Sequence, residues 1–253
     1  MPASLDSLLH EAEIAHGHLC AGQVLGVRMA MLALTRLGID DPRPRTLPDG
    51  SLNPDRKRLV TYIEIDRCAT DAIAVVTGCR VGKRALKLRD FGKMAATFVD
   101  LDNKLDDTDD YKALRIVALE TSKARARELY PDLDKNAQQM RSYRELPDAE
   151  LFFETWVRVS LPPSEFPGYK GERLACARCG EGVNFDRFVD RDGQRLCLAC
   201  ANPATLYYHP LCPTHHFVAV VLASLSLCHF LPEPASPFTS RPWFVRVSRA
   251  SRV

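Results

Sequence analysis

The sequence has almost no net charge and no long apolar run, and both absences limit the classes of function that it could have. It contains 34 Lys and Arg residues and 32 Asp and Glu residues, which give a formal net charge of +2 at pH 7. This balance gives no electrostatic argument that the whole chain binds nucleic acid or a membrane surface. The best membrane candidate, residues 217–227, is far shorter than the roughly 20 residues that a spanning helix needs. We therefore expect no membrane association.

A disulfide framework is also not expected, although the chain has nine cysteines. Their number is odd, four of them form two CxxC pairs, and the first residues (MPASLDSLLHEAE) are acidic and amphipathic, unlike a secretory signal. Disulfide-stapled domains are typical of secreted chains, whereas CxxC pairs in a reducing compartment bind metal. These features predict a cytoplasmic protein with metal sites.

The length of 253 residues allows one full core and a small second module. Apolar periodicity predicts an α+β core domain over residues 1–162, with helices packed on a mixed or antiparallel sheet. Proline and glycine indicate a linker over 163–173, followed by a zinc finger at 174–202. Residues 203–253 are rich in Pro and Arg, and we expect a poorly ordered tail without a function.

Individual elements follow from caps, breakers and periodicity. Ser4 is expected to cap a first helix, and Gly38 and Gly78 are expected to end two later helices. Helices are expected at residues 22–37, 69–77, 111–129 and 133–143, and strands at residues 58–66, 86–88, 95–101 and 154–161.

Three metal-binding side chains, His16, His18 and Cys20, lie within five residues of one another. In an extended backbone, residues at i, i+2 and i+4 point to the same face, so all three could converge on one ion or one substrate. Because the apolar helix pattern begins after Gly22, Cys20 would approach a helix N-terminus, where the dipole stabilises a thiolate. This cluster is the first candidate site.

Further candidate residues follow the strand predicted at 58–66. Cys68 is expected to join the first cluster, with Asp71, Cys79, Lys83 and Lys93 around it. Mixed imidazole and thiolate ligands suit zinc, copper or iron, and an incomplete set leaves an open coordination position. An alternative is a redox-active or nucleophilic thiolate with a histidine as base.

Other cysteines and histidines have simpler explanations. Cys79 follows an apolar run, and packing is the role that we favour for it, because a lone buried cysteine usually behaves as a small hydrophobe. The same explanation applies to Cys212 and Cys228. His10 is expected on a helix surface, and the pair at residues 215–216 has no partner that the sequence identifies.

The C-terminal CxxC pairs predict a zinc finger. Cys176, Cys179, Cys197 and Cys200 have the spacing of a four-thiolate zinc site, and Asp192-Gly193 between the pairs predicts a hairpin turn. A module this small lacks a core of its own, so its folding is expected to depend on the metal.

Four sequence blocks resemble the FmdE family, which is named after a component of formylmethanofuran dehydrogenase. They are HGHLCAG (16–22), CATDAIAVVTGCRVGK (68–83), DFGKMA (90–95) and CARCGE…CLAC in the finger. The resemblance implies an α+β core with a C-terminal treble-clef zinc finger, often as a homodimer. It also implies a pocket that binds metal through His16, His18, Cys20 and Cys68, beside the four finger cysteines.

The sequence departs from the family pattern at three places. Ala21 replaces a usual proline, Arg84-Ala85 replaces a usual Gly-Asn, and Pro203 stands where the finger helix would continue. Arg84-Ala85 directly follows Gly82 and Lys83, which are the candidate cofactor-binding residues. Pro203 predicts a shortened finger helix.

Three functions remain open. The first is a zinc-binding accessory protein associated with a molybdenum or tungsten pterin oxidoreductase, or with handling of its metal or cofactor. The second is a stand-alone metal-dependent enzyme, whose candidate catalytic residues are Cys20, Cys68, Asp71 and Lys93. The third is a nucleic-acid-binding regulator, which ranks last because the arginines of the finger are balanced by an equal number of acidic residues.

Overall fold

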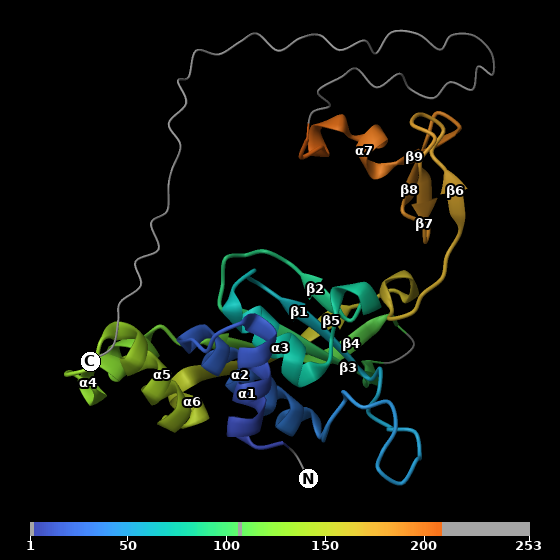
Figure 1. The fold of residues 1–253 in the computed structure, drawn as a ribbon. Helices are drawn as coiled ribbons and strands as arrows, with labels where there is room; N and C mark the ends of the chain where they lie inside the picture. Colours follow the sequence, from blue (N-terminus) through green and yellow to red (C-terminus); the bar gives the residue numbers. More distant parts are fainter. Residues whose placement is uncertain (1–2, 106–107, 209–253) are drawn as a thin grey trace, which may run out of the picture.

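The computed structural model describes residues 3–105 and 108–208, and its centre is a mixed five-stranded sheet (Figure 1). The strands lie in the order β2-β1-β3-β4-β5. Strands β1 and β2 pair in parallel, and all other neighbours pair antiparallel. Their bounds are β1 Leu59–Ile63, β2 Leu86–Leu88, β3 Ala95–Leu105, β4 Asp110–Ala118 and β5 Phe152–Ser160. The predicted α+β fold with a mixed sheet is confirmed.

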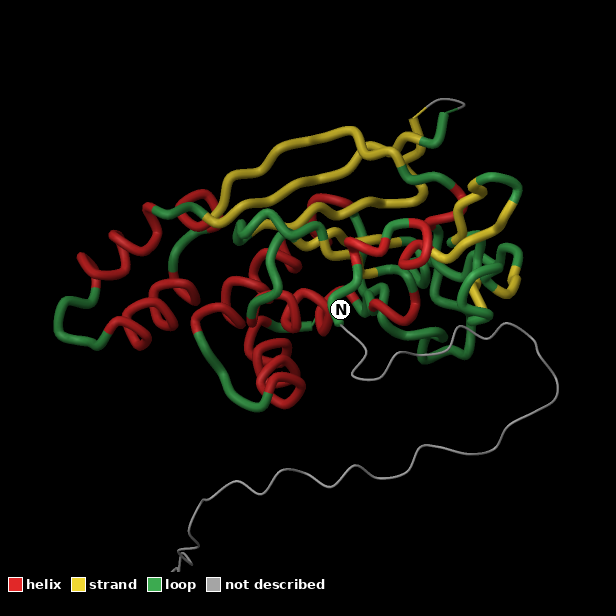
Figure 2. The backbone as a smooth tube through the Cα atoms, turned by 90° about the horizontal axis from the view of Figure 1, so that it is seen from above, coloured by secondary structure: helices red, strands yellow, loops and turns green. Residues whose placement is uncertain are grey.

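Helices cover one face of this sheet. Figure 1 shows α1, α2 and α3 side by side against the strands, with α4, α5 and α6 at one end, and Figure 2 shows the long strands as a separate layer. The core between the layers includes Val24 and Val27 of α2 and Phe98, Leu114 and Ile116 of the sheet. The helices are α1 Leu5–His16, α2 Ala21–Leu37, α3 Cys68–Thr77, α4 Thr121–Leu129, α5 Lys135–Glu145 and α6 Asp148–Leu151.

The predicted caps are present. The side chain of Ser4 accepts a hydrogen bond of 3.2 Å from the backbone N–H of Ser7 at the start of α1. Gly38 and Gly78 end α2 and α3 with φ angles of +63° and +66°, a conformation that glycine adopts without strain.

The predicted helix at residues 111–129 is wrong in its first half. Residues Asp110–Ala118 form β4, a strand between β3 and β5, and α4 begins only at Thr121. The strand is buried on both faces, since Tyr111 packs on one side and Leu114 on the other. A strand buried on both faces loses the alternation of apolar and polar residues that distinguishes it from a helix.

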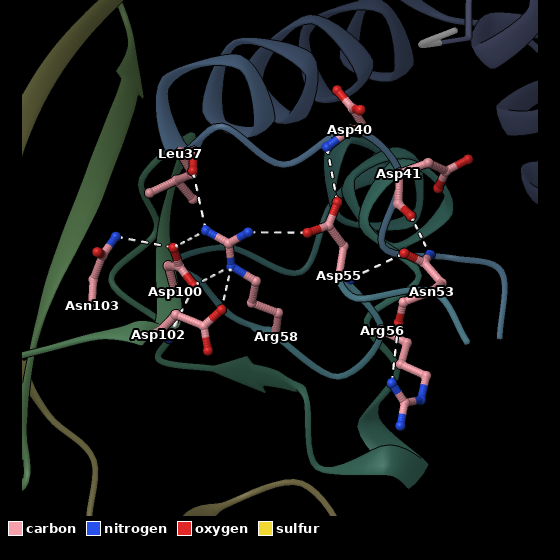
Figure 3. A network of polar contacts seen from close by, with 10 residues as sticks. All are labelled: Leu37, Asp40, Asp41, Asn53, Asp55, Arg56, Arg58, Asp100, Asp102 and Asn103. Atoms are coloured by element: carbon pink, nitrogen blue, oxygen red, sulfur yellow. Dashed lines mark hydrogen bonds and ion pairs between the residues drawn. The ribbon is translucent and has the colours of Figure 1, made fainter. Parts of the chain in front are cut away.

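A buried ion pair joins the start of β1 to β3 (Figure 3). The guanidinium of Arg58 donates to both carboxylate oxygens of Asp100, at 2.8 and 2.7 Å, and to Asp55 at 3.0 Å. Asp102 approaches the same guanidinium to 3.0 Å from the exposed side, while the side chain of Asp100 is fully buried. Asn103 adds a hydrogen bond to Asp100.

Smaller elements complete the described fold. They are the 3₁₀ turns η1 Val81–Lys83, η2 Pro163–Glu165 and η3 Pro203–Thr205, the strands β6 Arg173–Ala175, β7 Gly182–Asn184, β8 Phe188–Arg191 and β9 Gln194–Cys197, and the helix α7 Leu198–Ala201. Strands β6 and β7 form one hairpin, and β8 and β9 form another across the predicted turn at Asp192-Gly193. Helix α7 has only four residues and ends before Pro203.

The described helices include none that is both long and apolar enough to cross a membrane. Most of the predicted tail, with Cys212, Cys228 and the histidines at 215–216, lies outside the described residues.

Candidate metal centres

Two helix N-termini meet at the first candidate site. Cys20 is the residue that precedes α2, and Cys68 is the first residue of α3. Gly22 and Gly26 allow this approach: a Cβ atom on Gly22 would lie 3.1 Å from the Cβ of Cys68, and one on Gly26 would lie 2.5 Å from the backbone oxygen of Ala69. Two glycines four residues apart on α2 therefore let the two helices pack backbone against backbone.

The structure brings together His16, Cys20 and Cys68. His16 is the last residue of α1, and Gly17 turns the chain toward Cys20 with a φ of +93°. The ligand atoms of the three side chains lie within 4.8 Å of one another, a separation that allows one ion to contact all three.

His18 does not belong to this close set. Its ring centroid lies 4.9 Å from that of His16, and the side chain is exposed. The expectation of an extended segment from residue 16 to residue 20 is wrong, because His16 is still helical and residues 17–20 form a turn between α1 and α2.

Asp71 orients His16. It lies in the first turn of α3, and its Oδ2 is 2.8 Å from the Nδ1 atom of His16. A carboxylate only accepts hydrogen bonds, so Nδ1 carries the proton and Nε2 keeps a free lone pair. A histidine held by a carboxylate in this way is the usual arrangement at protein metal sites.

Gln23 supports the site and was not predicted from the sequence. Its side chain is fully buried, and its Nε2 donates a hydrogen bond of 2.8 Å to the backbone oxygen of Cys68. Its Oε1 has no partner among the described residues. The sequence offers one sign of this role, which is a polar residue within the otherwise apolar stretch 21–27 of α2.

The free thiol of Cys68 is poorly suited to act alone. Burial raises the pKa of Cys68, and the neighbouring thiol of Cys20 raises it further. The thiolate expected at Cys20 stays a prediction. A bound cation would favour ionisation at this site, because metal coordination favours the deprotonated thiol. The donors present, one imidazole and two thiolates, fit a transition metal such as zinc.

Two of the three other candidate residues, Cys79 and Lys83, lie apart from this cluster. Cys79 and Lys83 follow the opposite end of α3, a helix of ten residues and therefore about 15 Å long. Cys79 is 2% exposed and contacts Thr61, as its packing role predicts. Lys93 is exposed in the loop before β3, with its Nζ 6.0 Å from the ring centroid of Phe91. The expectation that these residues surround the His/Cys cluster is wrong for Cys79 and Lys83.

Gly82 and Lys83, the candidate cofactor-binding residues, belong to η1 and line a separate cavity of about 830 Å³. His10 is exposed on α1, as expected.

The second candidate site contains the four finger cysteines. The Sγ atoms of Cys176, Cys179, Cys197 and Cys200 lie within 4.8 Å of one another. The Cys179 and Cys197 sulfurs are 4.0 Å apart. Sulfurs placed about 2.3 Å from one zinc ion in a tetrahedron are about 3.8 Å apart, so the spacing fits a four-thiolate zinc site.

Two of the four thiols resist ionisation without a cation. Burial opposes ionisation of Cys176, but backbone N–H groups, led by that of Cys179, outweigh it and lower its pKa to about 6. Burial and neighbouring thiols raise the pKa of Cys200, and burial raises that of Cys179. Cys179 and Cys200 therefore need a cation to ionise near neutral pH.

The comparison with protein families identifies the chain. The family model described as "FmdE, Molybdenum formylmethanofuran dehydrogenase operon" matches residues 15–154. The chain belongs to this family. The match spans His16, Cys20 and Cys68, and the resemblance inferred from the sequence blocks is confirmed.

Two individual proteins resemble this FmdE family member. A curated protein of Archaeoglobus fulgidus, named "Probable S-adenosyl-L-methionine-binding protein", is 29% identical over 219 residues, which cover 79% of this chain and 54% of that protein. The chain thus spans about half the length of this relative. A solved structure from Syntrophus aciditrophicus, of a protein described as similar to the FmdE component of tungsten formylmethanofuran dehydrogenase, is 20% identical, with a TM-score of 0.48, and covers 81% of this chain and 95% of that one.

Proposed function

We propose that this FmdE family member is a cytoplasmic metal-binding accessory protein that serves a molybdenum or tungsten pterin oxidoreductase, or handles its metal or cofactor. Residues 1–162 form its core domain and residues 174–202 its zinc finger, joined by a linker at 163–173. The observation that carries the proposal is the pair of donor sets, each with ligand atoms within 4.8 Å, in a chain of this family.

In this proposal the two sites have different tasks. Four thiolates leave zinc in the finger fully coordinated, which is typical of a structural site. His16, Cys20 and Cys68 leave a metal with an open position, which a small ligand or a partner's side chain can occupy.

Metal content tests the proposal directly. Elemental mass spectrometry on the purified chain should find two metal ions per chain, and the Cys20→Ser variant should retain one. Cys79→Ala is the matched control, because Cys79 is a free cysteine outside both donor sets. One metal ion in both the parent and the Cys20→Ser protein contradicts a metal site in the core.

The partner requires a second experiment. The tagged chain, recovered from its native host, should enrich molybdenum or tungsten together with a pterin, and the Cys20→Ser variant should enrich them less. Equal enrichment by a chain that lacks the core ligand contradicts a role for this site in serving the oxidoreductase.

A homodimer is part of the proposal. Strand β5 is the last strand of the sheet, and its aromatic residues Phe153 and Trp156 are 59% and 47% exposed. Exposed aromatic residues on an edge strand favour pairing with another surface. Light scattering should give twice the chain mass, and Trp156→Lys should shift it toward the monomer.

A stand-alone metal-dependent enzyme is the second candidate function, because the three-ligand site with an oriented histidine resembles catalytic zinc sites in donor number. Cobalt substitution tests the open position. Added azide should change the visible spectrum of cobalt at an open site, and no change is expected at a closed one.

Nucleic-acid binding by the finger gains no support. Arg195 pairs with Glu172 at 2.6 Å, and Arg191 donates to the backbone oxygen of Ala201 at 2.8 Å. Arg178 donates to the backbone oxygen of Cys200. These arginines are engaged within the finger and its neighbouring strand, which leaves few donors for phosphates.

The name of the Archaeoglobus relative raises S-adenosylmethionine as a ligand. Among the described residues, the lining of the cavity at Gly82 and Lys83 contains no Asp or Glu that could face its sulfonium cation. A positively charged centre is unfavourable there, so we do not assign that ligand to this cavity.

A further inference from the structure

The cavity at Gly82 and Lys83 has a lining of basic and apolar residues. It has a volume of about 830 Å³, within the range of small-molecule sites. It lies between the C-terminal end of α3, the loop before β1 and the segment that enters the finger. Among the residues that the structure describes, its lining has no acidic residue and eight basic ones: Arg43, Arg45, Arg56, Lys57, Lys83, Arg84, Lys170 and Arg187.

Most of this positive charge is not neutralised by the protein. Within residues 3–105 and 108–208, only Arg43 of the eight takes part in an ion pair, with Asp41 at 2.8 Å and Glu11 at 2.7 Å. Like charges around one concave surface repel one another, and the low-dielectric wall strengthens their field toward the centre. An anion in the cavity would therefore be attracted by several cations together.

Arg84 is the residue of the cavity lining whose contacts are best defined. Its guanidinium lies 5.8 Å from the ring centroid of Tyr169 and 5.9 Å from that of Phe185, and its Nη2 donates to the backbone oxygen of Ser164. Its Nε and Nη1 are buried and have no hydrogen-bond partner among the described residues. Buried donors without a partner are costly, so these two N–H groups favour an acceptor supplied by a ligand.

Three basic or aromatic residues that line the cavity have a strained backbone conformation. Lys57, Arg84 and Phe185 have φ angles of +62°, +60° and +59°, in the left-handed region that favours glycine. They are three of the five non-glycine residues with positive φ in the described chain. Strained backbone conformations are concentrated at functional sites, where a particular side chain is needed although its backbone conformation is unfavourable.

We propose that this cavity binds a small ligand in which a phosphate group is joined to a planar ring. The two unpartnered donors of Arg84 suit phosphate oxygens, with Lys57 and Lys83 as further cations. Tyr169 and Phe185 offer apolar aromatic surface for the ring. The site is separate from both metal centres, so the proposal does not rest on the metal-binding function.

Titration calorimetry on the purified, zinc-loaded chain tests the ligand class. The probes are ADP and flavin mononucleotide, which share a phosphate and a planar ring, together with inorganic phosphate, adenosine and riboflavin. At least one of the two nucleotides should bind, should lose affinity at higher salt, and should bind more tightly than phosphate alone or its own nucleoside. Which of the two binds identifies the ring. Failure of both to bind at millimolar concentration overturns the proposal, as does equal binding by the nucleoside.

Arg84→Gly separates binding from folding. Glycine accepts a φ of +60° without strain, and this gain offsets the lost hydrogen bond from Arg84 to Ser164, so the melting temperature should change little. Loss of the two unpartnered donors should weaken nucleotide binding about tenfold to a hundredfold, because hydrogen bonds to charged groups contribute about 1.5–3 kcal/mol. Arg84→Lys should recover part of the affinity through its charge alone.

Arg158→Ala is the matched control, since Arg158 is an exposed arginine on β5 outside the cavity. Unchanged nucleotide affinity in Arg84→Gly overturns the proposal, and so does an equal loss in Arg158→Ala, which indicates non-specific charge attraction. Tighter binding of a single-stranded RNA oligonucleotide, lost in Arg84→Gly, would assign the cavity to nucleic acid instead and overturn the small-ligand proposal.

Discussion

The Nδ1 atom of His16 lies 2.8 Å from Oδ2 of Asp71, and this contact joins the last residue of α1 to the first turn of α3. Residues 55 positions apart in the sequence thus fix one imidazole ring. The side chain of His16 is 17% exposed and that of Asp71 is 57% exposed, so the carboxylate holds the ring from the solvent side. With Nδ1 engaged by Asp71, Nε2 is the ring nitrogen left to bind a metal.

Asp71→Asn should weaken metal binding in the core without affecting the finger. An amide holds the ring less firmly and makes it less basic, and loss of such a partner lowers metal affinity about 10- to 100-fold. A competition titration with a chromophoric chelator measures both sites. Asp132→Asn, a change at an exposed aspartate away from the site, is the control. Equal affinity in Asp71→Asn and the parent protein contradicts the positioning role.

The close approach of α2 and α3 leads to a second prediction. A Cβ atom on Gly26 would lie 2.5 Å from the oxygen of Ala69, so Gly26→Ala must push the helices apart. Overpacking of this kind costs about 1–3 kcal/mol. We expect a lower midpoint in urea unfolding and a lower metal content in the core, because Cys20 and Cys68 separate.

Gly82→Ala is the matched control for this stability measurement. A Cβ atom there would meet nothing within 4 Å, and the φ of Gly82 is not positive. Its unfolding midpoint should match the parent protein. If both variants unfold at the parent midpoint, the contact between α2 and α3 is looser than the structure indicates.

Local sequence patterns predicted the parts of the fold that depend on neighbouring residues. Ser4, Gly38 and Gly78 act through their own backbone and the adjacent turn, and all three are found in their expected roles. The finger hairpin at Asp192-Gly193 was predictable for the same reason. The meeting of Cys20 with Cys68 was expected from the order of elements and from the family blocks.

Contacts between segments that are distant in the sequence were predicted less well. Strand β4 was assigned to a helix because burial on both faces removes the alternating pattern. His18 shares the spacing of His16 and Cys20, but α1 is helical up to His16, and His18 lies outside the close donor set. The role of Gln23 was not predicted, since it depends on a backbone oxygen 45 residues away.

The ion pair between Arg58 and Asp100 gives a third prediction (Figure 3). Asp100 is fully buried and receives two hydrogen bonds from Arg58. Asp100→Asn removes the one fully buried carboxylate of the three that contact Arg58, so Asp55 and Asp102 still face the guanidinium. Hydrogen bonds to charged groups contribute about 1.5–3 kcal/mol, and the free energy of unfolding should fall by about this amount in urea denaturation.

Asp102→Asn is the control for this pair, because Asp102 contacts the same guanidinium but is 71% exposed. Exposed ion pairs contribute about 0–1 kcal/mol, so its unfolding should barely change. Similar losses in the two variants contradict the assignment of the stabilising effect to burial.

Metal loading of the finger should release protons in a number set by the thiol pKa values. Cys176 has a pKa of about 6 and is mostly ionised at pH 7 without metal, whereas the pKa values of Cys179 and Cys200 are raised, so both keep their protons. Zinc binds all four as thiolates. We therefore expect about two or more protons released per zinc at pH 7, and weaker binding as the pH falls. Calorimetry in buffers of different ionisation enthalpy, on the Cys20→Ser chain to isolate the finger, measures this number. Release of fewer than one proton contradicts the charge distribution described for the cluster.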